Sequence, residues 1–298
     1  MSDNKFVRLV ALIVLLGSAQ GNTWVVNEGG SVQAAIDSAG PSDVIMVERG
    51  TYEKVNVTKP LTLRGDGAIV DGGGNGSAIT LYADGILLEG FVATNYSKSP
   101  SEFAGIKVLS NNNIIENNTI YNGDAGTGIL LNGSNDNFIA ANNVTNNEVG
   151  IYILASSGNN ITDNVASKNG HGILLSNSGN NTVVENNASF NTEKGIGLEG
   201  STNNTLKRNL MSGNGYNFDA DGENDIDTSN LVDGKAVYYL VGAVDITIDS
   251  SSSPAGIVCC LNSSNITIKD QSFDESGSGI QFYNTTNSAI ENRGFRKT

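Results

Sequence analysis

A short apolar pattern recurs along this chain at intervals of about 22 residues. Each copy has a glycine, then an isoleucine, and then a second apolar residue two positions later. Side chains at positions i and i+2 lie on the same face of a β-strand, so the pattern predicts short strands with one buried face. The copies begin at Gly105, Gly128, Gly150, Gly172, Gly195, Gly256 and Gly279.

The length of the period indicates the architecture. At about 3.3 Å per residue, a repeat of this length suffices for one coil of three short strands joined by turns. Each coil then pairs its backbone with the next coil and buries an aliphatic column, so Ile129, Ile151 and Ile173 are expected to lie in one line. We therefore predict an all-β fold, a single-stranded parallel β-helix or solenoid, over residues 22–298.

Asparagines keep the same period and are a second marker of the repeat. Asparagine tolerates left-handed backbone angles, and its amide can hydrogen-bond to the same residue in the next coil. Most of these asparagines are therefore expected to be structural. The pairs are Asn112 and Asn117, Asn137 and Asn142, Asn159 and Asn164, Asn181 and Asn186, Asn204 and Asn209, Asn265 and Asp270, and Asn287 and Asn292.

Three segments depart from the repeat. Residues 31–39 have apolar side chains at the spacing of a short amphipathic helix, which is expected to cover the first coil. Residues 218–255 separate two copies of the strand pattern by more than one period and are interpreted as an insertion. No capping pattern is visible at the C-terminal end, which indicates further coils or a partner there.

Charge and the N-terminal segment restrict the partners and the compartment. The chain has 17 Lys and Arg residues against 31 Asp and Glu residues, a formal net charge of −14, which disfavours nucleic acid and anionic membranes as partners. Residues 1–21 combine basic residues, an apolar run and small residues, and they are interpreted as a cleavable signal peptide. The mature chain is expected to have no transmembrane segment and to be secreted or displayed on the cell surface.

Cysteines and glycosylation triplets add little constraint. Cys259 and Cys260 are adjacent and cannot join distant segments by a disulfide. Strand alternation predicts that Cys259 faces the core and Cys260 faces outward. Asn-X-Ser/Thr triplets are frequent and would be glycan acceptors in an exported protein, although a chain this rich in Asn, Ser and Thr also produces them by chance.

Two parts of the chain resemble a known family. Residues 29–72 resemble the N-terminal segment of many exported right-handed parallel β-helix proteins. Residues 224–242 and 255–270 are similar to the β-helix domain of NosD-type, pectate-lyase-like proteins, which are abundant on archaeal cell surfaces. The resemblance implies a right-handed, three-faced β-helix of the kind assigned to carbohydrate binding or sugar hydrolysis. It leaves the activity open, because this scaffold supports lyases, hydrolases, epimerases and inert surface fibres.

The resemblance also implies a role in copper delivery, and the ligand inventory argues against it. Copper favours imidazole, thiolate and thioether ligands. The chain has a single histidine, two adjacent cysteines and three methionines that do not cluster. The histidine, His171, lies in an Asn-Gly-His-Gly sequence and is interpreted as a solvated turn residue. Copper binding is therefore not expected.

The catalytic candidates lie just before the second asparagine of the repeat. Asp163 and Glu185 occupy this position in consecutive coils, and Arg208 follows in the next coil. Stacked coils place such residues about 4.8 Å apart, close enough for two carboxylates to share a proton and near the separation in retaining glycosidases. The alternative, which we favour, is a hydrated stripe in which Glu185 pairs with Arg208.

Alternating acidic residues near the start of the predicted insertion make a candidate calcium site. In an extended segment, Asp219, Asp221, Asp225 and Asp227 share one side and repel one another. A Ca²⁺ ion with several oxygen ligands would relieve this repulsion, although the glycine is misplaced for an EF-hand loop. The alternative is a solvated acidic loop.

A third candidate lies on the outward side of the recurring strand. The outward positions include Lys107, Leu130, Tyr152 and Leu174, which form an apolar and aromatic strip on a flat β-face. Such a strip is suited to stacking against sugar rings, and it would equally suit a neighbouring domain or a surface lattice.

Together these observations favour an exported, non-catalytic β-helix that acts in glycan binding, adhesion or envelope structure, because no complete catalytic set is visible. Polysaccharides or other cell-envelope components are the expected partners. A carbohydrate-active enzyme, such as a polysaccharide lyase, hydrolase or epimerase, is the main alternative, and a copper maturation factor is a distant third.

Overall fold

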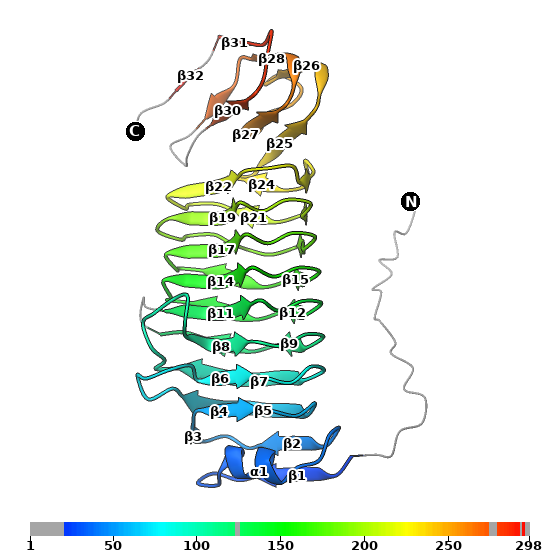
Figure 1. Cartoon of the computed structure of the whole chain (residues 1–298). Helices are drawn as coiled ribbons and strands as arrows, with labels where there is room; N and C mark the ends of the chain where they lie inside the picture. The colour runs from blue at the N-terminus through cyan, green and yellow to red at the C-terminus, as the bar shows by residue number, and fades with distance from the viewer. Residues whose placement is uncertain (1–20, 123–125, 274–278, 293, 296–298) are drawn as a thin grey trace, which may run out of the picture.

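The chain folds into a right-handed parallel β-helix, as predicted (Figure 1). The computed structural model describes residues 21–122, 126–273, 279–292 and 294–295, so the predicted signal peptide lies outside the described residues except for Gly21. Consecutive coils lie directly on one another in parallel register: Ile129 pairs with Ile151, and Ile151 pairs with Ile173. The predicted column of aliphatic residues is therefore confirmed.

One face of the helix, which we call the front sheet, is built mainly from the recurring Gly-Ile strands. Its outward side carries the predicted sugar-stacking strip. In the described residues the front sheet contains β4 (Val55–Val57), β6 (Ile79–Leu81), β8 (Ala104–Val108), β11 (Thr127–Asn132), β14 (Val149–Leu154), β17 (His171–Ser176), β19 (Lys194–Glu199) and β22 (Tyr216–Ala220).

A second face, which we call the back sheet, runs along the whole stack. Its strands are β1 (Thr23–Val26), β2 (Val44–Val47), β5 (Thr62–Asp71), β7 (Leu87–Thr94), β9 (Ile114–Glu116), β12 (Phe138–Ala140), β15 (Asn160–Thr162), β18 (Thr182–Val184), β20 (Thr205–Lys207) and β23 (Asp225–Ile226). Short strands form the third face: β3 (Thr51–Glu53), β10 (Thr119–Ile120), β13 (Asn143–Thr145), β16 (Val165–Ser167), β21 (Leu210–Met211) and β24 (Leu231–Val232). The long strands β5 and β7 pair with members of both sets.

Buried asparagines connect the coils at the turns between strands. The backbone N–H and the side-chain amide of Asn159, for example, both donate to Asn181 Oδ1 in the next coil, at 2.9 and 3.0 Å. Because a buried polar group without a partner is costly, these bonds fix the turn geometry. Three ladders of this kind run through Asn113, Asn137, Asn159, Asn181, Asn204 and Asn224; Asn118, Asn142, Asn164, Asn186, Asn209 and Asn230; and Asn147, Asn169, Asn191 and Asn214.

Asparagine was expected both to adopt a left-handed backbone and to hydrogen-bond to the next coil. In the structure two adjacent residues divide these roles. In the first regular coil the ladder residues are Asn113 and Asn118, one position later than predicted. The predicted residues, Asn112 and Asn117, instead have φ angles of 56° and 55°. In later coils the residue before the ladder asparagine keeps this left-handed backbone, even where it is Glu185 or Arg208, except before Asn224 and Asn230 at the ends of two ladders.

The N-terminal end is closed by α1 (Val32–Ser38), which lies within the range predicted for a helix. Ser31 caps it, because its Oγ accepts the backbone N–H of Ala34 at 3.1 Å. Val32 and Ile36 are buried in the same core as the first strands. The helix therefore covers the apolar end of the stack, as the lower part of Figure 1 shows.

Residues 218–255, predicted to be an insertion, form strands of successive coils. The interruption of the repeat is shorter than predicted. Phe218 on β22 pairs with Ile196 and continues the front sheet. The break comes at Asp233 and Gly234, where β24 turns back and pairs antiparallel with β25 (Lys235–Val241). The sequence signal was lost here because Phe218 replaces the isoleucine of the repeat.

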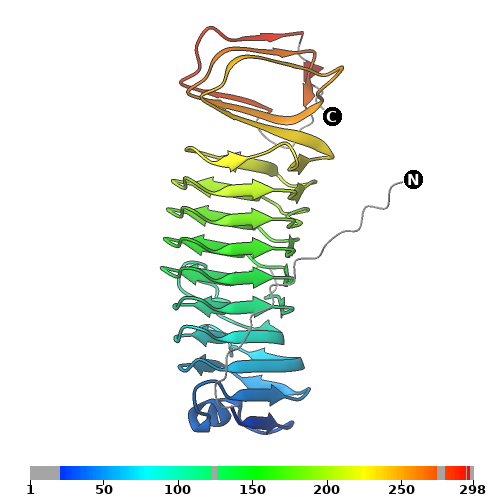
Figure 2. The ribbon, with the colours of Figure 1, turned by 90° about the vertical axis from the view of Figure 1, so that its right-hand side faces the viewer.

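Beyond this hairpin the chain forms a wider part with its own core, which we call the C-terminal part (Figure 2). Its strands are β25, β26 (Val244–Asp249), β27 (Ala255–Leu261), β28 (Ser264–Lys269), β29 (Ser272–Phe273), β30 (Ile280–Tyr283), β31 (Ala289–Glu291) and β32 (Gly294–Phe295). One face of β27 adds Ile257 and Cys259 to the main core. The other face adds Val258 and Cys260 to the second core, so the prediction that Cys260 faces outward is wrong.

Candidate functional site

The front sheet places the predicted strip in one column, but half of that strip is buried. Lys107 pairs in register with Leu130, Leu130 with Tyr152, and Tyr152 with Leu174. Leu130 is 0% exposed and Leu174 is 8% exposed, whereas Lys107 and Tyr152 are half-buried. The expectation of a continuous exposed strip is therefore wrong for the two leucines.

The segment between β7 and β8 explains why the start of the strip is covered. Lys107 Nζ donates to the backbone carbonyl of Glu102 at 2.6 Å and lies 5.8 Å from the centre of the Phe103 ring. Thr127 Oγ1 donates to the carbonyl of Pro100 at 2.7 Å. This segment thus lies against β8 and β11, next to Leu130. Its irregular sequence gave no signal that it would fold over the sheet.

A charged group that was not predicted covers the end of the strip at Leu174 and Gly197. Lys194, on β19, pairs with Glu199 at 2.9 Å and with Asp219 on β22 at 2.8 Å. Its stem crosses Gly197, where a Cβ would meet Lys194 Cδ at 2.9 Å and Leu174 Cδ1 at 3.1 Å. Burial lowers the pKa of the Lys194 ammonium, but the hydrogen bonds to Asp219 and Glu199 outweigh it and raise that pKa overall.

His171 lies beside this end of the strip and is not a solvated turn residue. It is the first residue of β17, its side chain is 21% exposed, and Nε2 lies 3.1 Å from the Glu193 carboxylate. Within the described residues Nδ1 is buried and has no hydrogen-bond partner. In this part of the strip Tyr152 is half-buried, whereas Leu174 and Gly197 are buried, with the Lys194 stem over Gly197.

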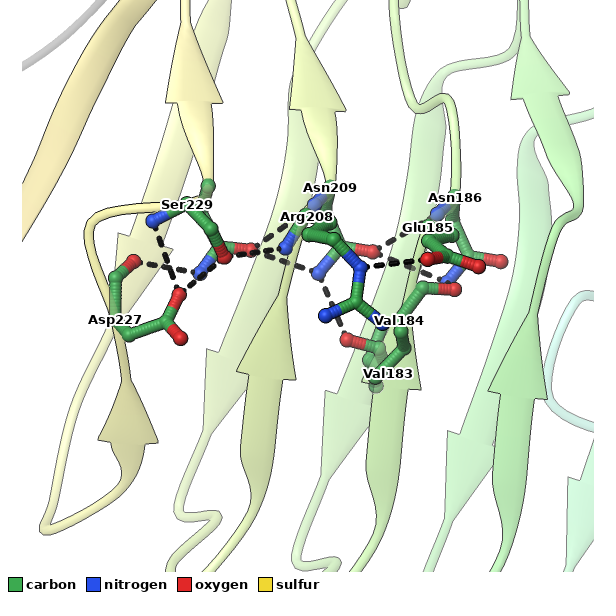
Figure 3. A network of polar contacts seen from close by, with 9 residues as sticks. Val183, Val184, Glu185, Asn186, Arg208, Asn209, Asp227 and Ser229 are labelled. Atoms are coloured by element: carbon green, nitrogen blue, oxygen red, sulfur yellow. Dashed lines mark hydrogen bonds and ion pairs between the residues drawn. The ribbon is translucent and has the colours of Figure 1, made fainter. Parts of the chain in front are cut away.

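Among the catalytic candidates, Glu185 pairs with Arg208 (Figure 3). Glu185 Oε1 lies 2.6 Å from Arg208 Nε in the next coil, and both side chains are about half exposed. The stripe continues through Ser229, whose Oγ accepts the backbone N–H of Arg208 at 2.9 Å. Asp163 is exposed and has a left-handed backbone, like its two neighbours in the column. The structure thus brings these residues into one column, with the Glu185 carboxylate already held by a guanidinium.

Two stacked carboxyl groups do occur elsewhere, at Glu89 and Glu116 on β7 and β9. Burial, together with hydrogen bonding to and repulsion from Glu89, raises the pKa of Glu116, while Arg64 opposes the shift. Arg64 Nε in turn lies 3.1 Å from Glu89 Oε1. The pair was not predicted because Glu89 lies in a coil that precedes the regular part of the repeat.

The predicted calcium ligands are not brought together. Asp219 pairs with Lys194, and Asp225 pairs with Lys207 at 3.2 Å. Asp221 Oδ2 accepts the backbone N–H of Gly200 at 3.0 Å, and Asp227 accepts the N–H of Ser229 at 3.0 Å. Among residues 21–122, 126–273, 279–292 and 294–295, no three His, Cys, Asp or Glu side chains are grouped so that they could hold a metal ion. The four carboxylates have separate partners in the structure, and the calcium site stays a prediction.

Comparison with known proteins identifies one family. The sequence profile described as "Periplasmic copper-binding protein (NosD)" matches residues 42–232. No curated protein sequence matches the chain. The described part of the chain contains no helix with the length and apolarity that crossing a membrane requires.

Several solved structures share the fold. An alginate lyase from Paenibacillus sp. strain FPU-7 is 15% identical with a TM-score of 0.54, over 93% of this chain and 99% of that chain. The enzymatically active domain of tailspike protein 2 from bacteriophage CBA120 is 14% identical with a TM-score of 0.54, over 92% of this chain and 43% of that chain. The PL6 family alginate lyase AlyGC is 13% identical with a TM-score of 0.52, over 87% of this chain and 53% of that chain. At these identities the likeness shows the fold alone.

The residues present do not fit copper. The thiols of Cys259 and Cys260 lie in different cores, and burial raises their pKa values to about 12 and about 11, which disfavours the thiolate that binds metals. Met211 is buried in the main core, far along the chain from Met46 on β2. His171 is engaged with a carboxylate. No copper chemistry is therefore derived for this chain.

Proposed function

Because this chain belongs to the NosD family of β-helix proteins, we propose that it is an exported, non-catalytic β-helix that binds a neutral glycan on the outward side of the front sheet. Adhesion to, or construction of, a cell envelope would use the same contact. The observation that carries this proposal is the half-buried Tyr152 on the outward side of the front sheet, in register with Leu174 and on the same face as the charge-paired Lys194.

The geometry of the strip suits a sugar ring. Tyr152 and Leu174 are neighbours in register, and the Lys194 stem covers Gly197, the next residue of the column. A ring would stack on the exposed part of Tyr152, while its hydroxyl groups reach toward Lys194, Glu199 and Asp219. Charged groups that are already paired can exchange hydrogen bonds with hydroxyls without creating an uncompensated charge.

Charge argues for a neutral glycan and against the anionic substrate of the structural neighbours. Alginate is a polyanion, and two of these neighbours are alginate lyases. This chain has a formal net charge of −14, and the Lys194 charge is shared by two carboxylates. A polyanion would therefore be repelled.

The test is direct binding to a glycan array, followed by calorimetry with the best neutral oligosaccharide. We expect Tyr152→Ala to weaken binding about tenfold, because stacking energy is lost. Tyr121→Ala is the matched control, since Tyr121 is an exposed tyrosine beside the third face. Absence of binding to any neutral glycan, or equal loss in both variants, would contradict the proposal.

The alternative, a carbohydrate-active enzyme, is favoured by one observation. Glu116 and Glu89 are stacked carboxyl groups, and the raised pKa of Glu116, caused mainly by burial, is the kind of shift that the acid of a glycoside hydrolase has. An assay for new reducing ends and for unsaturated products over a polysaccharide panel tests this alternative. If it is correct, Glu116→Gln abolishes product formation and Glu148→Gln, at an exposed position in another coil, leaves it unchanged.

A further inference from the structure

A second concave surface lies over the first coils, away from the front sheet. It is a groove of about 830 Å³ on the outward side of β1, β2, β5 and β7. Val25, Met46, Arg64 and Glu89 follow one another in register along its floor. Its volume is in the range of pockets that hold small molecules.

Local backbone features build the wall of this groove. The pairing of β5 with β7 is irregular between Arg64 and Ala68, so Gly65–Gly67 bulges outward. Gly90 has a φ of 76°, and a Cβ there would lie 2.0 Å from the Gly65 carbonyl oxygen, so a glycine is required at this contact. Arg49 holds the bulge, because its Nε donates to the carbonyl of Asp66 at 3.1 Å.

The residues that line the groove combine an apolar floor with an excess of negative charge. Val25 is 60% exposed and Met46 is 39% exposed, which is unusual for apolar side chains in neighbouring strands. Four carboxylates and two guanidinium groups line the groove. Arg64 is paired with Glu89, and Arg49 lies 3.5 Å from Asp66. Within the described residues, the Glu28 and Glu48 carboxylates have no ion-pair partner, so the groove has a negative field.

We propose that this groove binds an amino sugar unit of an oligosaccharide, a ligand class distinct from the neutral glycan of the front sheet. The ammonium group is held by Glu28 and Glu48, which supply the uncompensated negative charge. The apolar face of the ring covers Val25 and Met46, and its hydroxyl groups exchange hydrogen bonds with the Arg64–Glu89 pair. A neutral sugar fits the same floor but gains nothing from the two carboxylates.

The test uses calorimetry on the full mature chain with a fully deacetylated glucosamine trisaccharide as the probe, at about pH 6, where its amines are charged. The N-acetylated trisaccharide is the matched neutral probe. We expect the charged probe to bind at least about tenfold more tightly, and the double variant Glu28→Gln Glu48→Gln to remove about that difference.

Two further variants separate this groove from general electrostatics. Met46→Ala should weaken both probes, because it removes part of the apolar floor without changing the charge, and Glu148→Gln should affect neither, because Glu148 is exposed in a distant coil. Circular dichroism checks that every variant is folded. Equal affinity for the two probes, equal loss in Glu148→Gln, or no binding by the parent chain at millimolar probe would each overturn the proposal.

Discussion

Consecutive coils are held together differently in the regular part, from β8 to β22, and in the C-terminal part. The regular coils have three asparagine ladders and one interior. The C-terminal part has a second interior. There the predicted ladder positions, Asn265, Asp270, Asn287 and Asn292, have left-handed backbones, and the N–H of Ile266 is instead satisfied by Ser288 Oγ at 2.9 Å. The ladders thus accompany narrow, uniform coils, and the coils change shape where the ladders end.

The largest effect is expected from removing one ladder side chain. Asn186→Ala leaves the buried carbonyl of Ile161 and the buried N–H of Asn164 without partners, because Asn186 bonds to both at 2.8 and 3.0 Å. We expect a loss of about 3 kcal/mol in the free energy of unfolding, measured by urea denaturation. Asn180→Gly is the control, since Asn180 is exposed in a turn and glycine keeps its left-handed backbone (φ 57°). Similar losses in both variants would refute the structural role of the ladder.

The two adjacent cysteines sharpen the comparison, because each belongs to a different core. Their raised pKa values, about 12 for Cys259 and about 11 for Cys260, mean that the folded chain keeps its thiol protons above the usual thiol pKa. We expect Ellman's reagent at about pH 8 to react at least a hundredfold more slowly than with free cysteine. Rapid labelling of Cys260 alone would show that the second core opens independently.

The same shifts set a pH dependence. The unfolded chain loses its thiol protons near the ordinary pKa of about 8.5, whereas the folded chain retains them, so stability is full below that pH. It then falls as the pH rises toward about 11, where Cys260 ionises in the folded chain. The double variant Cys259→Ser Cys260→Ser should lose this part of the slope between about pH 9 and 11, measured by denaturation at each pH.

A smaller effect is expected at the stripe that flanks the second ladder. Glu185→Gln removes an exposed ion pair with Arg208 and should change the free energy of unfolding by less than about 1 kcal/mol. The variant to compare is Asn186→Ala, at the next residue, for which a loss of about 3 kcal/mol is expected. If Glu185→Gln destabilises as much as Asn186→Ala, the stripe contributes as much as the ladder to holding the coils together.

The smallest effect is expected in the C-terminal part. Asn284 Nδ2 donates to Asn262 Oδ1 at 2.8 Å, but both residues are exposed, so water can replace the bond. Asn284→Gly, which keeps the left-handed backbone of this position (φ 47°), should therefore change stability by less than about 0.5 kcal/mol. A loss comparable with that of Asn186→Ala would mean that this exposed pair acts as a ladder.

Periodicity predicted the architecture because it samples every coil at once. Ile129, Ile151 and Ile173 mark a column whose packing follows directly from their spacing. Expectation and structure differ where a single contact decides the outcome. Leu130 is buried by an irregular segment, Cys260 by a sheet that is covered on both faces, and Asp219 is drawn to Lys194 in the neighbouring coil. No repeat encodes such contacts, and the lysine could be found only by aligning the coils in register.

The ladders also have a direction, because in each step the donor belongs to the earlier coil and the acceptor to the later one. A nascent chain emerging from the ribosome therefore presents, at its growing end, a coil whose amide hydrogens await residues not yet synthesised. Each new coil supplies acceptors for the amide hydrogens of the coil before it. Its own amide hydrogens then lack acceptors until the next coil forms. Asn230 is the last acceptor of the second ladder, and it precedes the hairpin of β24 and β25. Coils after this hairpin do not continue that ladder.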